Sequence, residues 1–290
     1  MNLLIPIILS TLVAATPLIY AALGELVTER AGVLNLGVEG MMLIGALTAF
    51  AVGATTGNLV LAYCAAMGAA VLLSLLFAFL TLTLQANQVA TGLALTLFGI
   101  GLSAFAGRGF AGLPISGVKP FGVGILVGGS IVLYLAVDQF LRRTRSGLRL
   151  RAVGESPEVA HSLGQPVTRT RYLAVMFGGA TSGIAGAFIS TALTPMWVEG
   201  MSAGRGWIAL ALVVFATWKP LRVLLGAYLF GGVTVLQLYA QGFGLSIPSE
   251  FLSMLPYLAT IVVLVIICGD PRTIRLNQPA SLGKSFHPDA

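Results

Sequence analysis

Long apolar stretches, separated by short polar or glycine-rich segments, run along almost the whole chain. A helix that crosses a bilayer needs about 20 mostly apolar residues, with a range of roughly 17 to 25. The pattern therefore predicts nine membrane segments, at residues 3–23, 38–55, 59–84, 88–106, 122–141, 172–194, 206–218, 221–241 and 251–268. We expect an all-α polytopic membrane protein in which residues 1–290 form a single transmembrane domain.

Two parts of this pattern are irregular. Residues 24–40, GELVTERAGVLNLGVEG, are polar and rich in glycine, yet they run directly into the apolar MMLIGALTAF. Residues 206–218 are too short to cross a bilayer alone. Short or glycine-interrupted segments are typical of a transport pathway, because non-helical backbone at membrane depth needs protein or a watery cavity around it. The sequence leaves open whether these segments are re-entrant or belong to bent spans.

The composition agrees with a membrane protein, at 57% hydrophobic and 9% charged residues. The 16 Lys and Arg residues flank the apolar segments instead of forming a nucleic-acid-binding stripe. If residues 142–171 form a cytoplasmic loop, thirteen Lys and Arg residues lie on that side, against three outside: Arg108, Lys119 and Arg205. The positive-inside rule then predicts an external N-terminus, and a polar tail, residues 270–290, in the cytoplasm.

The loop at residues 142–171 holds seven arginines, and within it PEVAHSL, residues 157–163, has the marks of a short bounded helix. Ser156 is a good N-cap, and Pro157 and Glu158 suit the first turn. Gly164 favours a left-handed C-terminal residue, and Pro166 prevents the helix from continuing.

Val159 and Leu163, four residues apart, share one face of this expected helix. A helix shorter than about 12 to 15 residues is marginal in water. It therefore needs a packing partner, either its own membrane bundle or a soluble protein. Flanking arginines would also bind the anionic headgroups of membrane lipids.

No catalytic or metal-binding pattern is present. The chain lacks G-x-x-x-x-G-K-[ST], H-E-x-x-H, C-x-x-C and G-x-S-x-G, and Cys64 and Cys268 lie far apart. We therefore expect no enzyme activity, no metal and no cofactor in this chain. An ion-coupled secondary transporter or channel remains an alternative, but only Glu39 and Asp138 approach membrane depth, and Asp138 is placed to pair with Arg142.

Polar side chains inside a membrane are costly, so they are candidates for a substrate pathway. Glu39 could cap broken backbone, pair with Arg30, or line the pathway. Asn87 could be a plain N-cap of the next span. The aromatic candidates could contact a solute by stacking. The pathway candidates are Asn35, Glu39, Asn87, Gln88, Thr91, Phe98 and Trp207.

Three stretches resemble the permeases of ATP-binding-cassette (ABC) importers, in the branch that includes branched-chain amino acid and simple-sugar permeases. They are RAGVLNLGVEGMMLIGA (30–46), ANQVATGLALTLFG (86–99) and SGLRLRAVGESPEVAHSLGQPVTRTRYLAVMFGGATSGIAGA (146–187). The first two are similar to the nucleoside and simple-sugar subgroup, and the chain is similar to the shorter of two paired permeases.

The resemblance implies a permease for a nucleoside or simple sugar in a bacterial cytoplasmic membrane. A separate ATPase subunit would bind ATP and Mg, and an extracytoplasmic lipoprotein would deliver the substrate. A second homologous permease would complete a heterodimer, although a homodimer stays open. The resemblance also implies a coupling helix at about 155–164, with contacts to the ATPase from Gly154, Glu155, Ser156, Pro157, Glu158, Val159, Ala160, Leu163 and Gly164.

Overall fold

The computed structural model describes residues 4–112, 122–242 and 277–287, together with isolated positions between 251 and 265. All the regular elements in these residues are helices. The α-helices are α1 (Leu4–Arg30), α2 (Val38–Thr56), α3 (Leu59–Ala78), α4 (Gln88–Gly107), α5 (Val123–Arg143), α6 (Arg145–Glu155), α7 (Pro157–Ser162), α8 (Val167–Phe188), α9 (Arg205–Phe215) and α10 (Pro220–Gly242). Short π-helical or 3-10 turns extend α3 (Phe79–Thr83), α4 (Arg108–Phe110) and α8 (Ile189–Leu193).

Seven of the described helices are long and apolar enough to cross a membrane, namely α1 to α5, α8 and α10 with their extensions. The eleven-residue α9 is shorter than a span, as the sequence predicted. The ninth predicted segment, residues 251–268, lies outside the continuously described residues. The described part of the chain therefore supports a polytopic helical membrane protein with seven spans, and the count of nine stays a prediction.

The first span is longer than predicted, because α1 continues through the polar residues from Gly24 to Arg30. Leu26 and Val27 are buried in this part of the helix and hold it in the bundle. The chain then breaks at residues 31–37 and resumes as α2 at Val38. The irregular backbone is thus confined to seven residues instead of the whole 24–40 segment.

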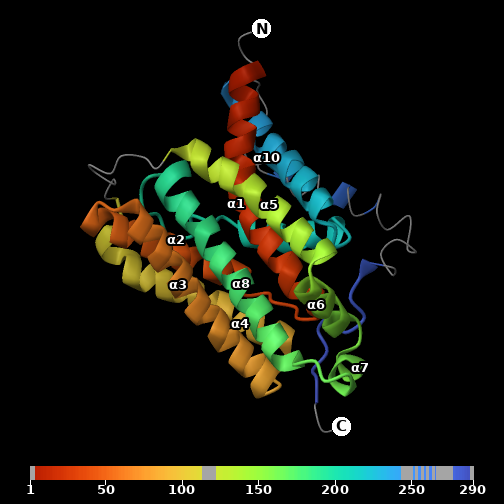
Figure 1. The fold of residues 1–290 in the computed structure, drawn as a ribbon. Coiled ribbons are helices and arrows are strands. Elements are labelled where there is room, and N and C mark those ends of the chain that lie inside the picture. Colours follow the sequence, from red (N-terminus) through yellow and green to blue (C-terminus); the bar gives the residue numbers. More distant parts are fainter. Residues whose placement is uncertain are drawn as a thin grey trace.

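Helix α8 lies at the centre of the bundle and packs against α1, α2 and α3 (Figure 1). Small residues on α8, such as Gly179 and Gly183, allow this close approach. A Cβ atom at Gly179 would meet the Ser74 side chain at 2.5 Å, and one at Gly183 would meet the Ala66 carbonyl oxygen at 2.6 Å.

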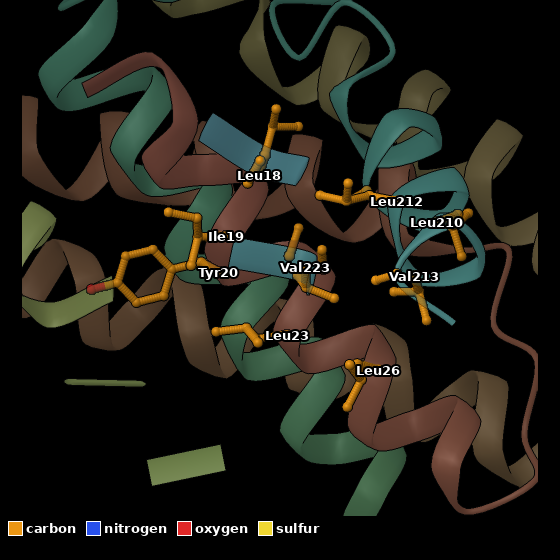
Figure 2. Packing of buried hydrophobic residues seen from close by; sticks show 14 of the residues in the cluster. Leu18, Ile19, Tyr20, Leu23, Leu26, Leu210, Leu212, Val213 and Val223 are labelled. Carbon is orange, nitrogen blue, oxygen red and sulfur yellow. The ribbon is translucent and has the colours of Figure 1, made fainter. Parts of the chain in front are cut away.

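The short helix α9 is held by an apolar core that it shares with α1 and α10. Figure 2 shows Leu23 and Leu26 of α1, Leu212 and Val213 of α9 and Val223 of α10 in one cluster of buried apolar side chains. All five side chains are buried. Helix α9 is too short to span the membrane, and packing against α1 and α10 holds it in position.

Helices α6 and α7 protrude together at one end of the bundle, far from the start of α1 (Figure 1). Residues 277–287, which we call the tail segment, lie beside them. Helix α6 was not predicted from the sequence. Its start is marked by Thr144, whose hydroxyl accepts a hydrogen bond from the Gly147 backbone N–H at 2.9 Å.

Candidate functional site at the α7 end of the bundle

Helix α7 has the predicted position. Ser156 is extended at the N-cap, but its hydroxyl caps no backbone N–H and instead lies 3.5 Å from the Glu158 carboxylate, to which it donates. Ser156 therefore occupies the predicted N-cap position without a capping hydrogen bond from its side chain. At the other end Gly164 takes the predicted left-handed conformation, with φ of +73°.

The two faces of α7 have different environments. Pro157 and Ala160 are buried, and Ala160 packs with Val153, Val167 and Phe286. On the opposite face, 57% of Val159 and 72% of Leu163 is exposed. Helix α7 thus packs against the rest of the chain with one face, and exposes Val159 and Leu163 on the other.

The other predicted coupling residues divide in the same way. Gly154 is buried, and a Cβ atom there would overlap the Arg30 carbonyl oxygen. Ser156 is half-buried, while Glu155, Glu158 and Gly164 are exposed. Gly154 therefore fixes α6 against the end of α1, and the charged residues border the outward face of α7.

Arg171 of α8 connects three segments at this end. The guanidinium is buried and donates to the carbonyl oxygens of Ala31 at 3.1 Å and Lys284 at 3.2 Å, and to the Ser281 hydroxyl at 3.1 Å. A buried charge is stable only when hydrogen bonds satisfy it. Arg171 thus holds both the break after α1 and the tail segment.

The tail segment makes further backbone contacts with the same elements. The Ser281 N–H donates to the Gly154 carbonyl oxygen at 3.0 Å, and the Gly283 N–H donates to that of Gly32 at 3.2 Å. Phe286 packs behind α7, with its ring centroid 5.5 Å from that of His161. The tail segment therefore joins α7 to the end of α1, whereas its sequence predicted only a polar tail.

Two further residues at the end of α1 hold the turn between α9 and α10. Trp218 in this turn has φ of +53°, which is unfavourable for a bulky residue. Its indole N–H donates to Glu29 at 2.6 Å, and its carbonyl oxygen accepts from Arg30 at 2.8 Å. Arg30 also donates to the Asn277 carbonyl oxygen at 3.1 Å, so the suggested Arg30–Glu39 pair is not formed.

Glu39, in the first turn of α2, caps the start of α9. Its carboxylate accepts hydrogen bonds from the Ser202 hydroxyl at 2.6 Å and from the backbone N–H groups of Gly204 at 3.0 Å and Gly206 at 2.6 Å. A negative charge is favourable at a helix N-terminus, where backbone N–H groups lack partners. Of the roles considered for Glu39, the geometry favours the cap of broken backbone.

The break at residues 31–37 is stabilised by polar side chains from three helices and by its own Asn35. The backbone N–H of Leu34 donates to Gln88 at 2.8 Å, and that of Asn35 donates to Glu25 at 3.1 Å. The Asn35 side chain in turn accepts from the Gly37 N–H at 2.9 Å. These buried side chains thus accept hydrogen bonds from backbone N–H groups that have no partner within a helix.

The remaining pathway candidates lie elsewhere. Asn87 is exposed and caps α4 by accepting from the Ala90 N–H at 2.9 Å, whereas Thr91 is buried. Phe98 and Trp207 are 50% and 38% exposed, so they alone among the seven candidates present a ring to the surroundings. The structure thus brings Asn35 and Gln88 together, and leaves Phe98 and Trp207 on separate helices.

Glu25 and Glu29 are two buried acidic residues that the sequence analysis missed. The prediction placed them in an irregular segment after the first span, while the structure places both inside α1. The signal was available in the spacing of Leu23, Leu26 and Val27, which continues a helical apolar face beyond the predicted end.

The seven apolar helices define a polytopic membrane protein, and the break before α2 with the Glu39-capped start of α9 is typical of transport proteins. The chain belongs to the family described as branched-chain amino acid transport system / permease component, which matches residues 7–267. This finding confirms the resemblance seen in the sequence. No solved structure matches the chain significantly.

Three curated relatives match most of this chain. A putative glucose ABC transporter permease, TsgC13 of Haloferax volcanii, is 42% identical over 96% of this chain and 96% of its own. The nucleoside permease NupC of Lactococcus lactis is 33% identical (91% and 92%), and the guanosine permease NupQ of Bacillus subtilis is 31% identical (97% and 96%). The protein is therefore a permease component of an ABC transporter.

Proposed function

We propose that the chain forms part of the translocation pathway of an ATP-driven importer for a simple sugar or a nucleoside. The α7 end of the bundle would face the cytoplasm and the start of α1 would lie outside. The excess of Lys and Arg in the loops of that end supports this orientation. Nothing in the sequence resembles an ATP-binding motif, so the importer needs a separate ATPase that binds ATP and Mg.

The outward apolar pair of α7 carries the proposal. Val159 and Leu163 are mostly exposed, while Pro157 and Ala160 are held against the rest of the chain. Fully burying a Val or Leu side chain contributes about 1.5 to 3 kcal/mol. Docking of this pair in a groove of the ATPase would therefore stabilise the complex, and would transmit movement of the ATPase to α8 and α1 through the tail segment.

A second permease subunit would complete the pathway. Helix α4 exposes a row of large apolar side chains, including Leu93, Leu97 and Phe105. The three relatives described above are named for glucose, nucleosides and guanosine, which all contain a sugar ring. We propose that Phe98 and Trp207 stack against the ring or base of such a substrate.

The other pathway candidates would act indirectly. Asn35, Glu39 and Gln88 hold the break and the start of α9, and so position Trp207. Asn87 and Thr91 begin α4, the helix that carries Phe98. A substrate-binding lipoprotein would deliver the sugar or nucleoside at the external end. A heterologous second permease is supported by the two glucose permeases of Haloferax volcanii, TsgC13 and TsgB13, which both match this chain.

The test replaces both Val159 and Leu163 by Asp in the purified importer, which is reconstituted with its ATPase. We expect insertion into the membrane to be retained, while binding of the ATPase and substrate-stimulated ATP hydrolysis are lost. Thr168→Asp, at an exposed site at the start of α8, is the matched control and should change neither. Normal coupling in the Val159/Leu163 variant would contradict the docking role of α7.

A separate uptake measurement distinguishes the substrate classes. Proteoliposomes containing the whole importer are given labelled glucose or labelled guanosine, each in competition with the other. ATP-dependent uptake of one of them supports the proposed class. Failure of both, with an intact and coupled complex, would contradict the substrate while leaving the role of α7 in place.

A further inference from the structure

An apolar cleft of about 440 Å³ lies on the bundle between α5, α6 and α8, away from the outward face of α7. Most of its lining is hydrocarbon or aromatic. The apolar residues are Leu133, Ala136, Val137 and Phe140 of α5, Leu173, Ala174 and Phe177 of α8, Leu150 of α6 and Val27 of α1. Neither the coupling surface nor the capped starts of α2 and α9 contribute to it.

The polar lining residues come from the ends of two helices. They are Ser146 and Arg149 of α6 and Thr170 at the start of α8. The apolar wall then continues along α8 to Phe177, about 10 Å farther, because a helix rises 1.5 Å per residue. The cleft is therefore amphipathic along its length, polar where α6 crosses it and apolar between α5 and α8.

The polar end carries strong positive charge. Residues 142–151 contain five arginines and no acidic residue. Arg142 is neutralised by Asp138 at 2.8 Å, which confirms the predicted i,i+4 pair. Arg149 is exposed and has neither a hydrogen bond nor an ion pair with any residue that the structure describes. An anionic group at this position would therefore meet an unpaired guanidinium.

The outer wall of the cleft faces outward. Among the lining residues, Ala136 of α5 is exposed, and Leu173 of α8 is 57% exposed. Apolar side chains at this exposure, on helices long enough to span the membrane, are solvated by lipid. A molecule that enters the cleft sideways thus comes from the bilayer.

We propose that this cleft binds one anionic phospholipid. Its phosphate would accept hydrogen bonds from Arg149 and Ser146, and one acyl chain would lie between α5 and α8, beside Val137 and Phe177. Basic pockets between transmembrane helices on the cytoplasmic side suit such headgroups. The bound lipid would fill space that the protein leaves open, and would join α6 to the membrane.

The test uses the whole importer, purified from nanodiscs that contain equal amounts of phosphatidylglycerol and phosphatidylcholine, and analysed by native mass spectrometry. Arg149→Gln is compared with Arg151→Gln, which removes the same charge from the same helix outside the cleft. We expect Arg149→Gln to lower retention of phosphatidylglycerol about tenfold, because a charge-assisted hydrogen bond is lost. Arg151→Gln should retain it.

A second variant, Ala136→Phe, keeps all charges and fills the cleft with a ring. We expect it to expel the phospholipid as Arg149→Gln does, and size-exclusion chromatography checks that each complex remains assembled. Equal retention of the two lipids, or retention unchanged by Arg149→Gln, would overturn the proposal. Cross-linking of an Ala136→Cys variant to the second permease subunit would also overturn it, since the cleft would then be a subunit interface.

Discussion

Replacement of Arg171 by Met tests whether the tail segment is held as the structure indicates. The change removes the guanidinium while keeping an unbranched side chain of similar shape. Two of the three Arg171 hydrogen bonds go to the tail segment, at Lys284 and Ser281, and the third goes to Ala31. Loss of the first two should let the tail segment separate from the bundle.

The magnitude follows from these contacts. A hydrogen bond from a charged donor contributes about 1.5 to 3 kcal/mol, so the two bonds contribute about 3 to 6 kcal/mol. Burial of a Met side chain does not carry the desolvation cost of a buried guanidinium. The net loss of free energy should therefore lie at the lower end of this range. About 3 kcal/mol corresponds to a factor of about 100 in the equilibrium between attached and separated tail segment.

Hydrogen exchange measures this equilibrium directly, because local opening exposes amides. The Ser281 and Gly283 amides, bonded to Gly154 and Gly32, should exchange about 100-fold faster in Arg171→Met. Arg169→Met, at an exposed site two residues away, is the control and should leave both rates unchanged. If the two variants exchange alike, Arg171 does not hold the tail segment.

Two other changes test the contacts around α9. Gly206→Ala places a Cβ atom 2.6 Å from Glu39, and overpacking of this kind costs about 1 to 3 kcal/mol, so we expect a lower thermal unfolding midpoint in detergent. Gly101→Ala, with no atom within 4 Å, should leave the midpoint unchanged, and equal midpoints in the two variants would refute the close contact. Trp218→Phe leaves the Glu29 carboxylate without its indole donor, and we expect a loss of about 1 to 3 kcal/mol in the free energy of unfolding; an unchanged free energy would contradict this role of the hydrogen bond.

The main helices could be predicted from the sequence because membrane spans are governed by a local requirement. Backbone groups in lipid are satisfied within the helix, so length and apolar character suffice to locate spans such as α4 and α10. The ends of α7 were predictable for a similar reason, since Pro157 and Gly164 act on their own backbone. The family was visible in three contiguous stretches of sequence.

The roles of single polar residues were not predictable in this way. Glu39 was a candidate for three roles, and only the approach of α9 shows that its carboxylate caps Gly204 and Gly206. Glu25 was not among the candidates, because the apolar pattern ended the first span before it. Its hydrogen-bond partner Asn35 lies in the break that follows α1.

The sequence by itself determined the class of protein, the positions of most of the described spans and the short helix α7, because hydrophobic length, capping residues and family motifs act over neighbouring residues. Only the tertiary structure decided that Arg171 joins the tail segment to the end of α1, and that Val159 and Leu163 face outward. These features depend on residues more than 100 positions apart, such as Arg171 and Ser281, and their contacts arise only when the helices have packed.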